Sequence, residues 1–179
     1  FLAGIPGTIG GALAMNAGCS GCETWNIVKS VITLNRHGEK KTRFPSEYEI
    51  AYRQVSVFPD EYYLAAHFQL EPGAKEKSLA KIRSLLLHRV TTQPTNEPNC
   101  GSVFRNPAGD YAARLIESCG LKGLKVGDAS VSTKHANFII NEGRATAADI
   151  ESLIEKITDI VFQIHHIQLI REVRIIGII

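Results

Sequence analysis

Hydrophobic residues change their spacing along the first half of the chain, and the spacing predicts where strands and helices lie. Apolar and β-branched runs bounded by turn residues predict strands over residues 27–35 and 62–70. Residues 40–44 follow a turn and are expected to return as the hairpin partner of the first strand. Apolar residues spaced three and four apart predict a helix with one buried stripe over 75–90, and a short helix is expected over 8–16.

In the second half of the chain, the spacing of hydrophobic residues again changes between that typical of helices and that typical of strands. Thr146 and Asp149 form a capping-box pattern of the acidic type, which marks the start of a long amphipathic helix, and Gly120 marks the end of a shorter one. The elements predicted for this half are helices over 111–119 and 146–166 and strands over 126–131, 137–140 and 172–179.

Strands and helices alternate without an internal repeat, which favours an α/β or α+β architecture. Between residues 90 and 107 the composition changes to Thr, Pro, Asn and Gly, which is typical of a boundary or an irregular functional loop. We therefore expect a domain border near Gln93.

Composition narrows the classes of protein to which the chain can belong. Hydrophobic residues make up 44% of its 179 residues, enough to bury a core, and the net charge of only +2 argues against a nucleic-acid binder. No apolar run approaches the ~20 residues that span a bilayer, and the first residues lack the pattern of a signal peptide. We therefore expect a cytoplasmic protein with no membrane partner. The chain begins at Phe1 and reads as a piece of a longer one.

The four cysteines include one Cys-x-x-Cys motif, formed by Cys19 and Cys22. Such a motif is compatible with a redox pair or with half of a zinc site. Cys100 and Cys119 stand alone, so no second pair at ligand spacing completes a metal set. Ordinary reduced thiols are the favoured interpretation, and no metal is expected.

The opening stretch "GIPGTIGGALAMNAG", residues 4–18, has two interpretations that its sequence does not separate. Glycines directly before a helix let an anion such as a diphosphate approach free main-chain N–H groups. Glycines are also typical of a tight turn followed by a closely packed helix. The spacing matches neither the dinucleotide-binding G-x-G-x-x-G motif nor a P-loop.

Three further residues have side chains suited to chemistry, although the local sequence alone favours a plain role for Ser102 and for Glu172. Ser102 in "CGSVFRNP" can relay a proton if it is buried, but a serine after glycine is usually a turn residue. Arg53 is a natural partner of a substrate carboxylate. Glu172 has Arg171 and Arg174 as neighbours, which favours a surface ion pair.

Taken together, four motifs in this order and separation resemble the UDP-N-acetylenolpyruvoylglucosamine reductases: "GIPGTIGGALAMNAG", "AYRQ", "CGSVFRNP" and "EVRIIG". Members of that family are flavoenzymes that complete UDP-N-acetylmuramate in bacterial peptidoglycan synthesis. The resemblance covers essentially the whole chain, including residues 121–141. It implies that the chain is N-terminally truncated relative to the family.

The resemblance also implies a fold. It is an α+β architecture in which residues 1–94 form part of an FAD-binding domain of the vanillyl-alcohol-oxidase type. Residues 95–171 would form a smaller α/β substrate-binding domain, and 172–179 a strand that returns to the missing N-terminal domain.

In the family, NADPH reduces FAD, and the flavin then passes hydride to the enolpyruvyl double bond of a UDP-sugar. The resemblance thus implies an FAD-dependent oxidoreductase that acts on a CH–CH bond with NADP. Position by position, the resemblance implies that Ser102 donates the proton, while Arg53 and Glu172 stabilise the enolate. Glu172 would need a raised pKa, which an apolar pocket can produce. The implied cofactor-binding residues are Gly4, Ile5, Pro6, Gly7, Thr8, Gly10, Gly11 and Asn16, with Gly18 nearby. The residues implied for the substrate are Tyr52, Gln93, Arg105, Asn106 and Lys122.

Two alternatives stay open. The chain is either a piece of such a reductase that retains flavin and activity, or an inactive fragment that binds no flavin. In a different class, it is an interaction or regulatory domain in which the glycine turn is purely structural. A truncated cofactor domain exposes apolar surface, which favours self-association.

Overall fold

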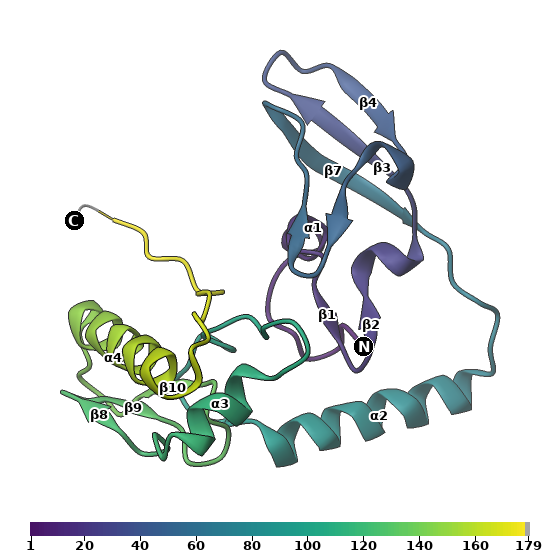
Figure 1. Cartoon of the computed structure of the whole chain (residues 1–179). Helices are drawn as coiled ribbons and strands as arrows, with labels where there is room; N and C mark the ends of the chain where they lie inside the picture. Colours follow the sequence, from purple (N-terminus) through teal and green to yellow (C-terminus); the bar gives the residue numbers. More distant parts are fainter. Residues whose placement is uncertain (178–179) are drawn as a thin grey trace. The chain divides into compact units, whose positions relative to one another are not determined.

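The computed structural model describes residues 1–177 and shows two compact units, one formed by residues 1–87 and the other beginning at His88 (Figure 1). Among the described residues, no helix is both long enough and apolar enough to cross a membrane.

An antiparallel sheet of three strands forms the centre of the first unit. Strand β3 (Val28–Asn35) lies between β4 (Lys40–Arg43) and β7 (Glu61–Phe68), so the order is β4-β3-β7 (Figure 1). All three strands were predicted from the sequence, and each is confirmed to within two residues at either end. The register of β3 with β7 shifts twice, between Val28 and Ser30 and between Ile32 and Thr33.

The core of the first unit is aromatic. The ring of Trp25 lies 4.7 Å from that of Tyr48, which in turn meets Phe58 edge-on at 5.3 Å. The indole N–H of Trp25 donates to the carbonyl oxygen of Leu13 at 2.8 Å, so this large side chain is buried with its polar atom satisfied. The aromatic cluster therefore fixes the helix that carries Leu13 against the sheet.

That helix, α1 (Ile9–Ala14), is the short helix expected after the glycines, and the Thr8 hydroxyl caps it by accepting from Gly11 N at 3.1 Å. Irregular pieces surround it. They are the two-stranded hairpins β1 (Gly18–Cys19) with β2 (Cys22–Glu23) and β5 (Ile50–Ala51) with β6 (Gln54–Val55), and the 3₁₀ turns η1 (Thr24–Ile27) and η2 (Pro45–Glu47).

The predicted helix over 75–90 is present as α2 (Lys75–Thr92), but the buried stripe expected along it is wrong. None of its residues is buried, and Leu79 is 43% exposed. Helical spacing shows which face of a helix is apolar, but whether another element packs on that face depends on the rest of the fold.

In the second unit, helices α3 (Ala112–Ser118) and α4 (Ala147–His165) accompany a small antiparallel sheet of order β10-β9-β8. Both helices were predicted. The expected single strand over 126–131 is wrong, because Gly127, with a φ of +53°, turns the chain and divides it into β8 (Lys125–Val126) and β9 (Ala129–Val131). Strand β10 (Ile139–Asn141) confirms the strand predicted over 137–140 and is displaced by one or two residues.

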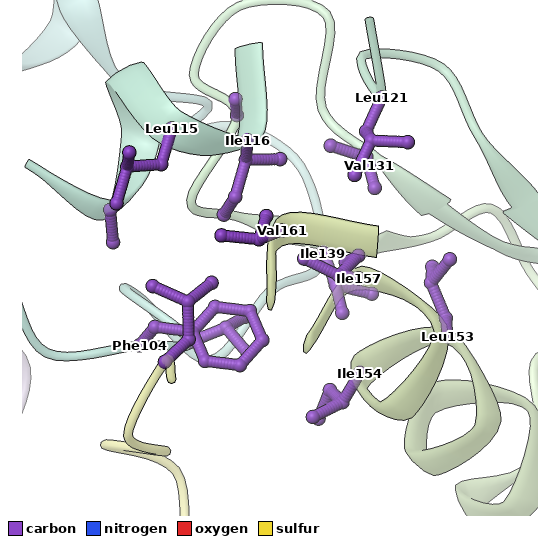
Figure 2. Close-up of a cluster of buried hydrophobic side chains, with 14 of the residues drawn as sticks. Phe104, Leu115, Ile116, Leu121, Val131, Ile139, Leu153, Ile154, Ile157 and Val161 are labelled. Carbon is purple, nitrogen blue, oxygen red and sulfur yellow. The ribbon is translucent and has the colours of Figure 1, made fainter. Parts of the chain in front are cut away.

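In the core of this unit, the inner face of α4 packs against α3 and the sheet, as Figure 2 shows for Ile154, Ile157 and Val161. Phe104, which lies in an irregular segment, contributes the largest fully buried side chain. The capping box predicted at the start of α4 is confirmed. The Thr146 hydroxyl accepts from Asp149 N at 3.1 Å, while the Asp149 carboxylate accepts from Thr146 N at 2.8 Å.

The closing strand expected over 172–179 is absent from its described part, residues 172–177, while residues 178–179 lie outside the described range. A single bridge pairs Arg171 with Phe104. Beyond it, Glu172 N and Val173 N both donate to the carbonyl oxygen of Val103, at 2.8 and 3.3 Å. Successive N–H groups of a strand point to opposite sides, so two donations to one acceptor are incompatible with a regular ladder.

A charged cluster ties together all three strands of the first sheet. Glu61 on β7 accepts from Nη2 of Arg43 on β4 at 2.6 Å and from the Thr33 hydroxyl on β3 at 2.7 Å. The Glu61 side chain is only 8% exposed. Its hydrogen bond with Arg43, helped by that with Thr33, lowers the pKa of the carboxyl from 4.5 to about 2.

We therefore expect the first unit to lose stability in acid through Glu61. A carboxyl with a lowered pKa in the folded state stabilises fully above its unfolded pKa, and this contribution is lost as the pH falls from about 5 towards 2. Glu61→Gln should lower the free energy of unfolding by about 1–3 kcal/mol at pH 7, and the difference should vanish near pH 2. Urea titrations followed by fluorescence of the single tryptophan, Trp25, measure this, with the exposed Glu71→Gln as control. If the free energy of unfolding of Glu61→Gln fell with decreasing pH as steeply as that of the wild-type chain, the role given to Glu61 in acid would be contradicted.

Candidate functional site

The glycine-rich turn borders a hollow of about 340 Å³ in the first unit. Five of the eight residues predicted to bind a cofactor line it, together with apolar neighbours; the lining residues are Leu2, Ile5, Pro6, Gly7, Thr8, Ile9, Gly11, Ala12, Met15 and Ala17. Concave, mostly apolar surfaces with a few polar groups are typical of ligand sites. Gly4 and Gly10 do not line the hollow but lie beside residues that do.

Asn16, also predicted to bind the cofactor, uses its side chain inside the protein. It is fully buried, and its Nδ2 donates to Glu23 Oε2 at 2.7 Å and to the carbonyl oxygen of Ala51 at 3.1 Å. Its Oδ1 accepts from Trp25 N at 3.2 Å. Asn16 therefore joins the end of the glycine stretch to hairpin β5–β6, and its role towards a cofactor stays a prediction.

The Tyr52-Arg53 pair forms the tip of hairpin β5–β6 and lies against the same stretch. Nη2 of Arg53 donates to the carbonyl oxygen of Gly18 at 2.8 Å, and the guanidinium lies 4.8 Å from the centre of the Tyr52 ring. Arg53 has a φ of +56°, as the tight turn requires. Two motifs that are more than thirty residues apart in the sequence thus meet in one unit.

In the second unit, the segments that carry Ser102 and Glu172 lie side by side. Glu172 N donates to the carbonyl oxygen of Val103, the residue after Ser102, at 2.8 Å. Both Ser102 and Glu172 are half-buried. The structure therefore places the backbone segments that carry two of the three residues predicted to be catalytic next to each other. Arg53 belongs to the other unit, and its approach to this pair stays a prediction.

Asn137 is a residue that the sequence reasoning missed. It is buried, and its Oδ1 accepts from Phe104 N at 3.0 Å while its Nδ2 donates to the Phe104 carbonyl oxygen at 2.8 Å. Its own carbonyl oxygen accepts from Val103 N at 2.9 Å. One asparagine thus holds the segment directly after Ser102. The available signal was a lone amide inside the apolar run "HANFII".

The residues predicted to bind substrate differ in how their polar atoms are used. Oε1 of Gln93 and Nε of Arg105 are buried and have no hydrogen-bond partner among the described residues, which fits groups that receive a ligand. Asn106 Oδ1 accepts from Ala112 N at 3.1 Å at the start of α3. Lys122 forms an ion pair with Glu117 at 2.7 Å, and Tyr52 is 43% exposed.

One histidine close to this region has a shifted pKa. Burial, with a contribution from the positive charge of Lys122, lowers the pKa of His135 below its ordinary value, while Glu117 opposes the shift. Its Nδ1 accepts from Asn137 N at 3.3 Å, and its ring packs edge-on against Phe138. Burial therefore favours the neutral form of this ring, which lies next to the asparagine that supports the serine segment.

All four cysteines are free thiols. Within residues 1–177, no three histidine, cysteine or acidic side chains gather in a way that would hold a metal ion.

Comparison with known proteins gives consistent results. Residues 93–176 match the family described as "UDP-N-acetylenolpyruvoylglucosamine reductase, C-terminal domain". Over 178 residues the chain is 63% identical to the UDP-N-acetylenolpyruvoylglucosamine reductase of Legionella pneumophila (strain Corby), covering 99% of this chain and 58% of the relative. It is 56% identical to the reductase of the same name from Thiobacillus denitrificans, covering 99% of this chain and 55% of that protein.

A solved structure shows the same fold. The crystal structure of UDP-N-acetylenolpyruvylglucosamine reductase from Thermus caldophilus matches with a TM-score of 0.82 and 34% identity, over 94% of this chain and 60% of that one. The chain thus spans somewhat more than half the length of these relatives.

Replacement of Asn137 tests its support of the serine segment. Asn137→Leu leaves the buried N–H and C=O of Phe104 without partners, so we expect the second unit to lose roughly 2 kcal/mol or more of stability. Hydrogen–deuterium exchange at Phe104 should accelerate, and chemical denaturation followed by circular dichroism measures the free energy. Asn137→Asp keeps the acceptor for Phe104 N but places a carboxylate oxygen against the Phe104 carbonyl oxygen, so it should also destabilise the second unit. The exposed Asn96→Leu is the control, and an equal, small effect of both leucine variants would argue against this role.

Proposed function

Because the chain belongs to the UDP-N-acetylenolpyruvoylglucosamine reductase family, we propose that it contributes to the NADPH-dependent, FAD-mediated reduction of UDP-N-acetylenolpyruvoylglucosamine to UDP-N-acetylmuramate. The observation that carries most weight is the pairing of the Ser102 segment with Glu172, reinforced by the placement of Arg53 on the glycine stretch. These are the residues that the family motifs assign to the chemistry.

The hollow beside the glycine turn fits part of a flavin. It is lined by apolar side chains and by Gly7, whose φ of +144° excludes most other residues. Ile5, Pro6 and Ala12 would bury the cofactor's apolar surface, and main-chain groups of the turn would meet its polar atoms. When bound, FAD supplies hydride transfer, first from NADPH and then to the enolpyruvyl double bond.

Arg53 would hold the substrate carboxylate. Hydride addition moves negative charge onto this group, so a guanidinium interacts more strongly with the developing enolate than with the starting enol ether. The bond to Gly18 fixes part of the guanidinium before substrate arrives. Such pre-organisation lowers the reorganisation needed during the reaction.

Ser102 would donate the proton to the enolate carbon. A serine hydroxyl is a weak acid, so it acts through position, and the segment that follows Ser102 is held on one side by Asn137 and on the other by Glu172. We propose that Glu172, half-buried beside that segment, stabilises the enolate. Gln93 and Arg105, with Asn106 and Lys122, are proposed for the substrate's diphosphate and sugar.

Flavin uptake tests the cofactor site. We propose to titrate FAD into this chain and into a hybrid that carries ahead of it the remaining N-terminal part of the Legionella relative. Ala12→Phe fills the hollow and should weaken binding by at least about tenfold, whereas Ala14→Phe, on the same helix but exposed and away from the hollow, should not. The absorbance band of bound oxidised flavin is the readout.

The outcomes of this titration separate the alternatives. Binding by the hybrid alone would identify the isolated chain as a fragment that does not retain flavin. Binding by neither protein, or equal binding by both phenylalanine variants, would reject the proposed cofactor site.

Ser102→Ala tests the proton donor in the flavin-loaded hybrid. Reduction of the flavin by NADPH should be unchanged, because it needs no proton on the substrate carbon. Reoxidation by the enolpyruvyl substrate should slow by roughly 10²–10⁴-fold. Rapid-mixing absorbance follows both steps, and Ser152→Ala, at an exposed serine on α4, is the control. Unchanged reoxidation in Ser102→Ala would reject this role, and a flavin-loaded hybrid that reduces no substrate would reject the function itself.

A further inference from the structure

The two cysteines of the Cys-x-x-Cys motif lie opposite each other in the β1–β2 hairpin. Cys19 and Cys22 are Cα partners in this antiparallel pair, and both are free thiols. Directly opposite residues of a strand pair project their side chains from the same face. Cys22 is exposed and Cys19 half-buried, so at least one thiol is open to a reagent in solution.

The turn between them holds this arrangement. Ser20 and Gly21 have φ values of +55° and +77°, and positive φ at both central residues defines the type I′ turn, whose twist matches that of the flanking strands. A positive φ is unfavourable for serine, so the hairpin holds Ser20 in this conformation. The thiols therefore stay on one face of the hairpin.

The geometry falls within the range that a disulfide allows. Opposite residues of an antiparallel pair have Cα atoms about 4.5–5.5 Å apart, and disulfides span Cα separations of about 4.4–6.8 Å. Their Cβ atoms, about 4.5–5.5 Å apart in such a pair, have to approach by roughly 0.7–1.7 Å to reach the mean disulfide separation of about 3.8 Å. Each strand of this hairpin has only two residues, and among the described residues no third strand joins the sheet, so the adjustment is local.

We propose that Cys19 and Cys22 form a reversible disulfide by exchange with a small-molecule disulfide such as oxidised glutathione. The thiolate of Cys22 attacks one sulfur of the small disulfide and releases one small thiol. The thiolate of Cys19 then attacks the Cys22 sulfur and releases the second. Two protein thiols are oxidised, one small disulfide is reduced to two thiols, and the two protein protons leave with those thiols.

Two features indicate that the bridge is a reversible modification and not a structural disulfide. The loop that it closes contains only the two turn residues, so it removes little chain entropy from the unfolded state and is readily reduced again. It also lies next to Gly18, whose carbonyl oxygen holds Arg53. The proposal does not depend on the reductase function, because it rests on the hairpin alone.

The test equilibrates the chain with glutathione buffers of increasing oxidised fraction. The peptide map of the wild-type chain should show a Cys19–Cys22 link, and Cys100 and Cys119 should be either free or in mixed disulfides with glutathione. In the matched variant Cys100→Ser/Cys119→Ser, the two remaining thiols, those of Cys19 and Cys22, should both be consumed by the bridge. Cys22→Ser in that background should form only a mixed disulfide with glutathione.

A comparison with the unfolded chain shows whether the fold favours the bridge. The equilibrium constant for bridge formation in the double variant should be at least about tenfold larger in the native state than in denaturing guanidinium chloride. An equal or smaller native constant would overturn the proposal. So would a disulfide in the wild-type chain that links other cysteines, or two chains, while Cys19 and Cys22 remain free.

Discussion

Irregular backbone that enters a protein interior must find hydrogen-bond partners, and this requirement shapes both parts of the candidate site. Two buried asparagines meet it. Asn16 pairs with Ala51, Glu23 and Trp25 in the first unit, and Asn137 pairs with both main-chain groups of Phe104 in the second. An amide side chain offers a donor and an acceptor at once, so it replaces a missing strand neighbour. These pairs help to fix the course of the segments that carry the family motifs.

The regular elements serve these segments mainly by carrying them. The aromatic cluster around Trp25 fixes α1 and the stretch before it, and the core formed by α3, α4 and the small sheet buries Phe104. Phe104 is two residues from Ser102, so burial of its ring anchors a loop that otherwise runs along the surface. Residues placed on loops by a rigid scaffold are typical of binding and catalytic sites.

The sequence predicted those parts of the fold that depend on local patterns. The apolar run of β3, the capping box of α4 and the turn before β4 each depend on residues that are close together in the sequence. All three predictions were confirmed. The failures were non-local. The apolar spacing of α2 did not show whether anything covers it, and the strand expected after residue 171 depended on a neighbour that the described residues do not supply.

The same division applies to the site. The family motifs indicated Ser102, Arg53 and Glu172, and the structure shows two of these segments in contact, but no motif pointed to Asn137. Its role depends on Phe104, thirty-three residues away, and on a hydrogen-bond pattern that no local spacing encodes. A single amide in an apolar run is a weak signal by itself, since it becomes informative only when its partners are known.

The glycines of the opening stretch differ in whether the described fold requires them. Gly4 and Gly7 have positive φ, and a Cβ on Gly18 would lie 2.5 Å from the Cys22 carbonyl oxygen, so the fold itself demands these three. Gly10 and Gly11 lie in α1 without positive φ, and a Cβ on either would meet only the Thr8 hydroxyl, at 3.8 and 3.6 Å. Alanine would be compatible with the backbone there and would strengthen the helix by about 0.5–1 kcal/mol at each position. Among the described residues, packing therefore does not require glycine at positions 10 and 11, and their role towards a ligand stays a prediction.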